Sequence, residues 1–105
     1  MLILNRLGVI VLMFDLPTAA KNQKRLAANF RKNIMHMGYT ALQKSVYVKL
    51  VRNTERYAAE INIIDSIAPN GKIVCLPMSL GTFKKCCNLR GNFDFNLFSD
   101  PIIQI

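Results

Sequence analysis

Hydrophobic and polar positions change their period several times along this chain, and each change marks an element. Val9 to Phe14 is an unbroken apolar run that is too short for a helix, and it predicts a central strand. After it, a period close to 3.6 predicts a helix that Thr18 caps and that runs to about Met37, with Gly38 as its stop. The buried face of this helix is expected to carry Leu26, Ala27, Phe30, Ile34 and Met37.

The central third of the chain predicts further strands and a second helix. Residues 39–50 combine strand formers with interspersed polar groups, so they predict one long strand or a bent pair of strands. Asn53 or Thr54 can cap a helix whose apolar positions recur at helical spacing until Pro69 ends it. The apolar positions of that helix are Tyr57, Ile61, Ile64 and Ala68.

The remaining segments predict one clear strand and two less regular pieces. Residues 72–78 predict a strand, and Pro77 restricts it to a sheet edge or a bulge because proline lacks the amide hydrogen. Residues 80–87 suit a short helix, and the alternation in residues 93–97 suits a short strand. The apolar end, residues 101–105, is expected to pack against protein rather than face water.

The order of these elements predicts an α+β fold. Strand, helix, strand pair, helix and strand is the order of a split β-α-β, or ferredoxin-like, antiparallel sheet with helices on one face. We expect residues 1–105 to form a single domain, with residues 88–105 as a C-terminal extension that contributes to a dimer. In that homodimer the uncovered sheet faces of two copies pack face to face.

Composition adds two expectations about partners. The chain is 51% hydrophobic, which is high for 105 residues and favours a buried subunit interface. Its formal net charge of +8 favours a polyanionic partner. No apolar run approaches the roughly 20 residues that span a bilayer, so we expect no membrane insertion and a cytoplasmic protein whose cysteines are thiols.

One acid stands out because it ends the first apolar run. Asp15 is followed by no further acid until Glu55, and burial of such a carboxylate is costly unless it is paired or bound to a cation. Two copies facing each other across a dimer axis could hold one Mg²⁺, which typically binds through one or two carboxylates, waters and phosphate oxygens. Such an ion could activate water against a phosphodiester. In the alternative interpretation Asp15 only caps the turn or the first helix.

The cations that follow predict a nucleic-acid surface. Residues 16–54 hold eight basic residues and no acid, whereas a merely soluble surface usually mixes both signs. No aromatic residues suited to base stacking are interleaved with these cations, so contact with the backbone of a duplex is favoured over single-strand binding. The candidate binding residues are Lys21, Lys24, Arg25, Arg31, Lys32 and Lys44.

A set of short motifs resembles a known family. The sequence Phe14-Asp15-Leu16-Pro17-Thr18 is followed by Arg25, Phe30-Arg31-Lys32, Gly38 and Gln43-Lys44-Ser45-Val46-Tyr47. Together these motifs look like the CRISPR-associated protein 2 family over roughly residues 9 to 90. The Asp-Leu-Pro-Thr and Ser-Val-Tyr variant is similar to members that accompany type II systems. Residues 1–8 and 88–105 carry no family motif that we can align.

The resemblance implies a role in CRISPR adaptation, the acquisition of new spacers. It implies a homodimer that works with CRISPR-associated protein 1, the integrase, and lies along prespacer duplex DNA through the helix of Arg25, Arg31 and Lys32. It also implies that Asp15 matches the family aspartate assigned to binding Mg²⁺ (or Mn²⁺) and to endonuclease activity on RNA or DNA. Such an activity is dispensable if the cellular role is scaffolding.

Two other functions remain open from the sequence. A ribonuclease toxin of the virulence-associated protein D type shares the expected fold, and an adjacent CRISPR array with an integrase gene would argue against it. A basic ferredoxin-like module without catalysis would also fit the composition. Binding that stays constant between low and moderate salt would count against every nucleic-acid interpretation.

Overall fold

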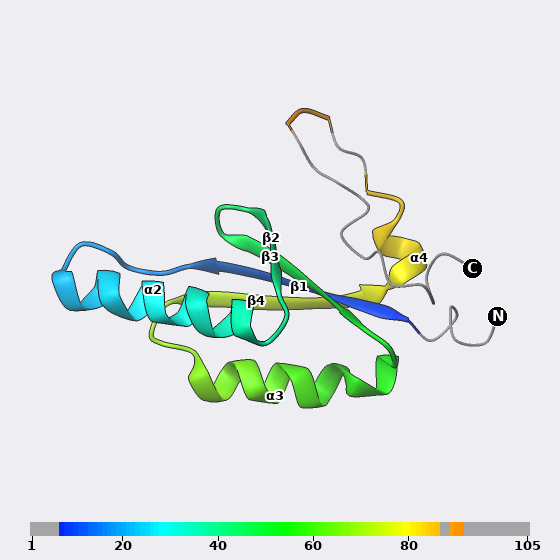
Figure 1. The fold of residues 1–105 in the computed structure, drawn as a ribbon, viewed down its shortest axis with the longest axis horizontal. Helices are drawn as coiled ribbons and strands as arrows, with labels where there is room; N and C mark the ends of the chain where they lie inside the picture. Colours follow the sequence, from blue (N-terminus) through cyan, green and yellow to red (C-terminus); the bar gives the residue numbers. More distant parts are fainter. Residues whose placement is uncertain (1–6, 87–88, 92–105) are drawn as a thin grey trace.

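The computed structural model describes residues 7–86 and 89–91 of the chain, in which strands and helices alternate (Figure 1). In chain order the elements are β1 (Gly8–Asp15), α2 (Lys21–His36), β2 (Thr40–Gln43), β3 (Val46–Val51), the 3₁₀ turn η1 (Thr54–Arg56), α3 (Tyr57–Ile67), β4 (Lys72–Ser79) and α4 (Leu80–Phe83). The segment after the first helix is therefore a pair of strands and not one long strand. The expected strand in residues 93–97 and the apolar end lie outside the described residues.

The strands form an antiparallel sheet in the order β2-β3-β1-β4, with β1 in the middle as expected. This is the strand order of the ferredoxin-like fold, so the predicted fold class is confirmed. Pro77 lies on β4, an edge strand of the described sheet, where its missing amide hydrogen costs no ladder bond on the open side. Within the described residues, no helix combines the length and apolar character needed to cross a membrane.

Helices α2 and α3 pack on one face of the sheet and build the larger core (Figure 1). Alternate residues of β1 point into this core, namely Ile10, Leu12 and Phe14. The ring of Phe14 meets the ring of Phe30 on α2 edge to face, with 5.3 Å between centroids. Ile34 and Ile64 close the layer from α2 and α3, and both are almost fully buried.

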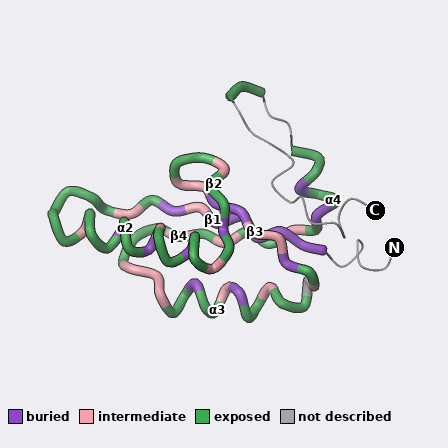
Figure 2. Tube along the Cα trace, in the orientation of Figure 1, coloured by how far each residue is buried: buried purple, intermediate pink, exposed green. Residues whose placement is uncertain are grey.

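The opposite face of the sheet is apolar but only partly covered. Val9 and Val11 of β1 and Val48 of β3 are buried there beneath Leu80 and Phe83 of the short helix α4. Figure 2 shows that burial along β1 contrasts with the exposed surface of much of β4. We call this apolar surface the open face. It also includes Met13, Leu42, Val46, Leu50, Val74, Leu76 and Met78.

The boundaries and faces of α2 differ in part from the prediction. The helix begins at Lys21 and not after Thr18, because the Gln23 side chain accepts the Ala20 amide hydrogen at 2.9 Å and fixes the first turn there. Its end is as predicted, with Gly38 at φ +99°. Leu26 was expected in the core but is 45% exposed, because its position on the helix turns away from the sheet.

Two shorter elements also refine the prediction. Asn53 does begin the second helical segment, since its Oδ1 accepts the Glu55 amide hydrogen at 2.9 Å, but a 3₁₀ turn precedes α3. The helix expected over residues 80–87 is confined to Leu80–Phe83. Cys75 and Cys86 are free thiols, and burial raises the pKa of Cys75, whereas Cys87 lies outside the described residues.

Candidate nucleic-acid interface and carboxylate site

Asp15 is the last residue of β1 and is exposed. Because side chains alternate along a strand, it shares the open face with Val9, Val11 and Met13. Within the described residues its carboxylate makes no hydrogen bond or ion pair, so Asp15 caps neither the turn nor α2, and the capping alternative is wrong. The cost of burying a carboxylate does not arise in one protomer, because this carboxylate faces water.

A lysine lies on each side of Asp15, Lys72 on the neighbouring strand β4 and Lys44 in the turn between β2 and β3. Lys72, the first residue of β4, is its direct partner in the antiparallel register. On the other side, the amide of Phe14 donates to the carbonyl of Ser45 at 3.1 Å, which holds the turn with Lys44 next to the end of β1. A carboxylate and a phosphate charge that lie 5 Å apart in water repel each other by about 0.8 kcal/mol. Cations on both sides of Asp15 offset a repulsion of that size.

The cations of α2 form a line along the exposed surface of the helix. Lys21, Arg25 and Lys32 are spaced by four and seven residues, so they lie on one stripe, and all three are exposed. Lys24 is exposed one step to the side of this stripe. A helix of this length extends about 24 Å, which is enough to follow several phosphates of a duplex backbone.

Arg31 is placed differently from the other α2 cations. It was predicted to bind nucleic acid together with them, but it is half-buried, because it lies one turn from the buried residues Ala27 and Ile34. Its Nε is inaccessible and has no hydrogen-bond partner within the described residues. Only the outer end of this guanidinium is therefore in a position to meet a phosphate.

The predicted site residues thus fall into two groups and not one. Asp15 and Lys44 lie at one end of the sheet, with Asp15 on the open face, whereas the α2 cations belong to the helix layer on the opposite face. Figure 1 shows that α2 begins near the end where β1 stops, so the groups share one end of the molecule but not one face. A duplex along α2 and a reaction at Asp15 therefore use different surfaces of a protomer.

A buried charged cluster was missed by the sequence analysis. The ammonium of Lys49 lies 2.6 Å from Oε1 of Glu60, whose side chain is 8% exposed, and the hydroxyl of Tyr39 donates to the same oxygen at 3.4 Å. Burial, followed by the charge of Glu60, raises the pKa of Tyr39 strongly. Lys49 is one of the eight cations between residues 16 and 54, and this ion pair removes it from the charge offered to a partner.

The residues around Asp15 in one protomer do not provide enough ligands for a divalent ion. Within residues 7–86 and 89–91, no group of three or more His, Cys, Asp or Glu side chains is placed to hold a metal ion. One carboxylate from each of two copies would match what Mg²⁺ takes from protein when waters and phosphate oxygens complete its shell. The residues therefore fit the ion only if a second copy brings its own Asp15.

Comparison with known proteins places the chain in a family. The family described as CRISPR associated protein Cas2 matches residues 9–86. A Campylobacter jejuni protein named CRISPR-associated endoribonuclease Cas2 is 34% identical over 88 residues, covering 83% of this chain and 62% of that protein. A Streptococcus mutans protein of the same name is 30% identical over 89 residues, covering 84% of this chain and 83% of that protein.

A third relative matches a shorter region of the chain. A Flavobacterium psychrophilum protein, also named CRISPR-associated endoribonuclease Cas2, is 33% identical over 67 residues, which cover 61% of this chain and 56% of that protein. The chain thus spans less than two thirds of the length of the Campylobacter and Flavobacterium relatives. The matched region includes β1 from Val9 to Asp15, all of α2, and Lys72 on β4. The chain therefore belongs to the CRISPR-associated protein Cas2 family.

Proposed function

We propose that this chain is a homodimeric CRISPR adaptation protein that binds duplex nucleic acid and scaffolds the integrase, CRISPR-associated protein 1. Family membership and the exposed α2 cations support this role. The duplex, a prespacer DNA, lies along α2 of each protomer, held by phosphate contacts that carry no sequence information. Lys24 and the outer end of Arg31 add to the stripe of Lys21, Arg25 and Lys32.

We further propose that the dimer is a metal-dependent endonuclease through paired Asp15 residues, with RNA or DNA as substrate. The names of the relatives support nuclease chemistry. The observation that carries the proposal is an apolar open face that ends in an exposed carboxylate, which has no hydrogen-bond or ion-pair partner among residues 7–86 and 89–91. Packing two open faces together would bury apolar surface and bring both Asp15 residues to one interface.

The residues of this chain divide the work of such a site. Asp15 of both copies would hold one Mg²⁺ or Mn²⁺, which when bound supplies an activated water and charge stabilisation at the scissile phosphate. Lys44 neutralises approaching phosphate charge from the β2–β3 turn. The apolar residues of the open face set the separation of the two carboxylates and exclude water from the interface.

The dimer itself can be tested with a matched pair of variants. Leu76 on the open face is 46% exposed and Ile63 on the outer side of α3 is 47% exposed, so the two side chains are equally accessible in one protomer. We expect Leu76→Glu to convert the dimer to monomers in sedimentation velocity, because it buries a charge in the interface. Ile63→Glu should remain dimeric. A dimer that survives Leu76→Glu, or that Ile63→Glu dissociates, would contradict the face-to-face arrangement.

A further inference from the structure

Lys72 occupies a position that the proposed reaction can use. It is the residue directly opposite Asp15 in the β1–β4 register, and opposite residues of antiparallel strands carry their side chains on the same face. Their Cβ atoms are then about 4.5 to 5.5 Å apart. Building on the proposed nuclease function, we propose that the Lys72 ammonium binds the phosphate group of the nucleic acid on which Asp15 acts.

The chain holds Lys72 in this place through its neighbour Gly71. Gly71 has φ +146°, and a Cβ atom there would lie 2.7 Å from Cδ2 of Leu16 and 3.3 Å from the carbonyl oxygen of Asp15. A residue without a side chain is therefore required for the turn before β4 to approach the end of β1 so closely. This close approach sets the register that places Lys72 beside Asp15.

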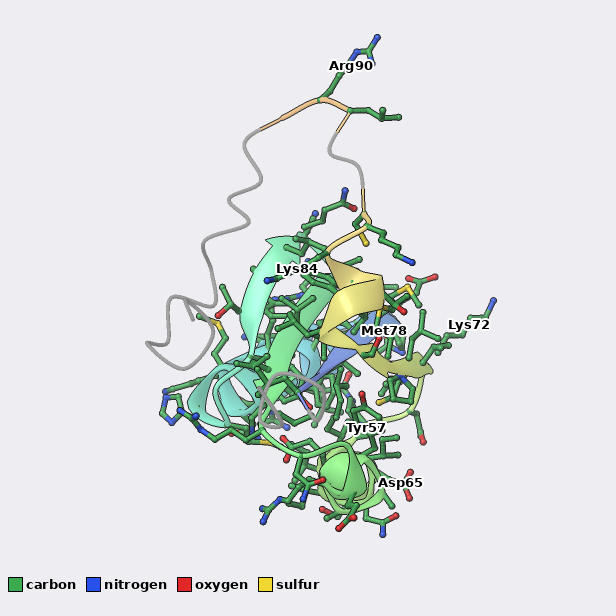
Figure 3. All side chains as sticks on the ribbon, turned by 90° about the vertical axis from the view of Figure 1, so that its right-hand side faces the viewer. Tyr57, Asp65, Lys72, Met78, Lys84 and Arg90 are labelled. Atoms are coloured by element: carbon green, nitrogen blue, oxygen red, sulfur yellow. The ribbon has the colours of Figure 1, made fainter. Side chains whose placement is uncertain are left out.

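The ammonium of Lys72 is available for a ligand. Figure 3 shows its side chain projecting outward from the protein, away from α3, and the residue is exposed. Both Lys72 and Asp15 lie in the described part of the chain, and no ion pair joins their side chains. A flexible ammonium with three donors suits a phosphate oxygen whose position changes during a reaction.

The charge balance at this end of the sheet favours an anion. Lys44 flanks Asp15 from the β2–β3 turn and Lys72 flanks it from β4, so each protomer brings two cations and one carboxylate. In the proposed homodimer these groups would be doubled around one interface. A phosphodiester backbone meets net positive charge there in spite of the two carboxylates.

An exposed lysine on an edge strand has an alternative role, which is to prevent pairing with the edge of another sheet. That role predicts aggregation when the lysine is removed, with no change in nucleic-acid binding. The phosphate-binding role predicts weaker binding and slower cleavage by a protein of unchanged oligomeric state. The two roles are therefore separated by sedimentation and by the salt dependence of binding.

The experiment compares Lys72→Ala, Lys72→Arg and the control Lys84→Ala in the full chain. Lys84 is also an exposed lysine, and it follows α4 beyond the opposite end of β4 (Figure 3). We expect Lys72→Ala to lower kcat/KM for cleavage about 10-fold to 100-fold, as for loss of a charge-assisted contact, and Lys72→Arg to restore most of it. Lys84→Ala should cleave like the wild type.

Binding gives a second measurement that needs no metal. With EDTA present, the slope of log affinity for a short duplex against log salt should fall by about 0.9 per lost phosphate contact, or about 2 per dimer, in Lys72→Ala. An unchanged slope with cleavage equal to that of Lys84→Ala would overturn the inference, and so would aggregation without a change in slope.

Asp15→Asn, measured in parallel, separates this inference from the proposed function. If Asp15→Asn cleaves like the wild type, the nuclease proposal itself fails. If Asp15→Asn is inactive while Lys72→Ala is unaffected in both cleavage and binding, only the role of Lys72 fails. A loss of cleavage in Lys72→Ala that Lys72→Arg does not restore, with an unchanged salt slope, also contradicts phosphate binding.

Discussion

Asp15→Asn is expected to lower metal-dependent cleavage of nucleic acid by about 100-fold or more, because the amide keeps the shape of the carboxylate but loses its charge. Asp15 is exposed and its carboxylate makes no hydrogen bond or ion pair within the described chain, so the free energy of unfolding and the dimer should change little. Cleavage rates with Mg²⁺ and with Mn²⁺, together with duplex affinity in EDTA, measure the expected separation of chemistry from binding.

Asp65→Asn is the matched control for that substitution. Asp65 is an exposed carboxylate on α3, on the helix side of the sheet and away from the open face (Figure 3). Its loss should leave cleavage unchanged. In cells that carry the array and the integrase, Asp15→Asn should still acquire spacers if scaffolding is the cellular role. Loss of acquisition by a folded Asp15→Asn dimer would contradict scaffolding as a function independent of Asp15.

Removing the stripe of α2 cations is expected to have the largest effect on binding. The triple variant Lys21→Ala, Arg25→Ala, Lys32→Ala loses six phosphate contacts per dimer. The slope of log affinity against log salt should therefore fall by about 5. We therefore expect affinity for a duplex to fall by about 100-fold to 1,000-fold at low salt. All three residues are exposed on α2, so the fold should tolerate alanine there.

A second triple variant tests whether position or total charge is responsible. Arg56 lies in the 3₁₀ turn, and Lys84 and Arg90 follow α4; all three are exposed, so their replacement by alanine removes the same charge without touching α2. Its salt slope should stay near that of the wild type. Equal losses in the two triple variants would show that binding depends on net charge and that α2 is not the duplex surface.

The local parts of the fold could be predicted because their signals lie within a few residues. The apolar run up to Phe14 indicated the central strand, Gly38 the end of α2, and Pro77 an edge strand. The start of α2 could not be predicted from Thr18, because the side chain that fixes the first turn belongs to Gln23. Leu26 was misassigned because an ideal helical wheel does not show where the sheet ends.

The candidate site was predicted as residues but not as an arrangement. Its components depend on pairing between strands far apart in the sequence, and no local pattern contains that register. Lys72 was therefore missed although it lies opposite Asp15, and Lys49 was counted as a free cation although Glu60 neutralises it. The spacing of Lys49 on β3 and Glu60 on α3 in the sequence gave no sign of that ion pair.

The shared metal site is tested most directly by the separation of the two Asp15 carboxylates in a structure of the dimer with Mn²⁺ or Mg²⁺. We predict one ion between the two chains, with carboxylate oxygens about 4 Å apart if both bind it directly and up to about 8 Å if a water intervenes. Carboxylates more than about 10 Å apart, or an ion bound without Asp15, would contradict the shared site at the end of the open face.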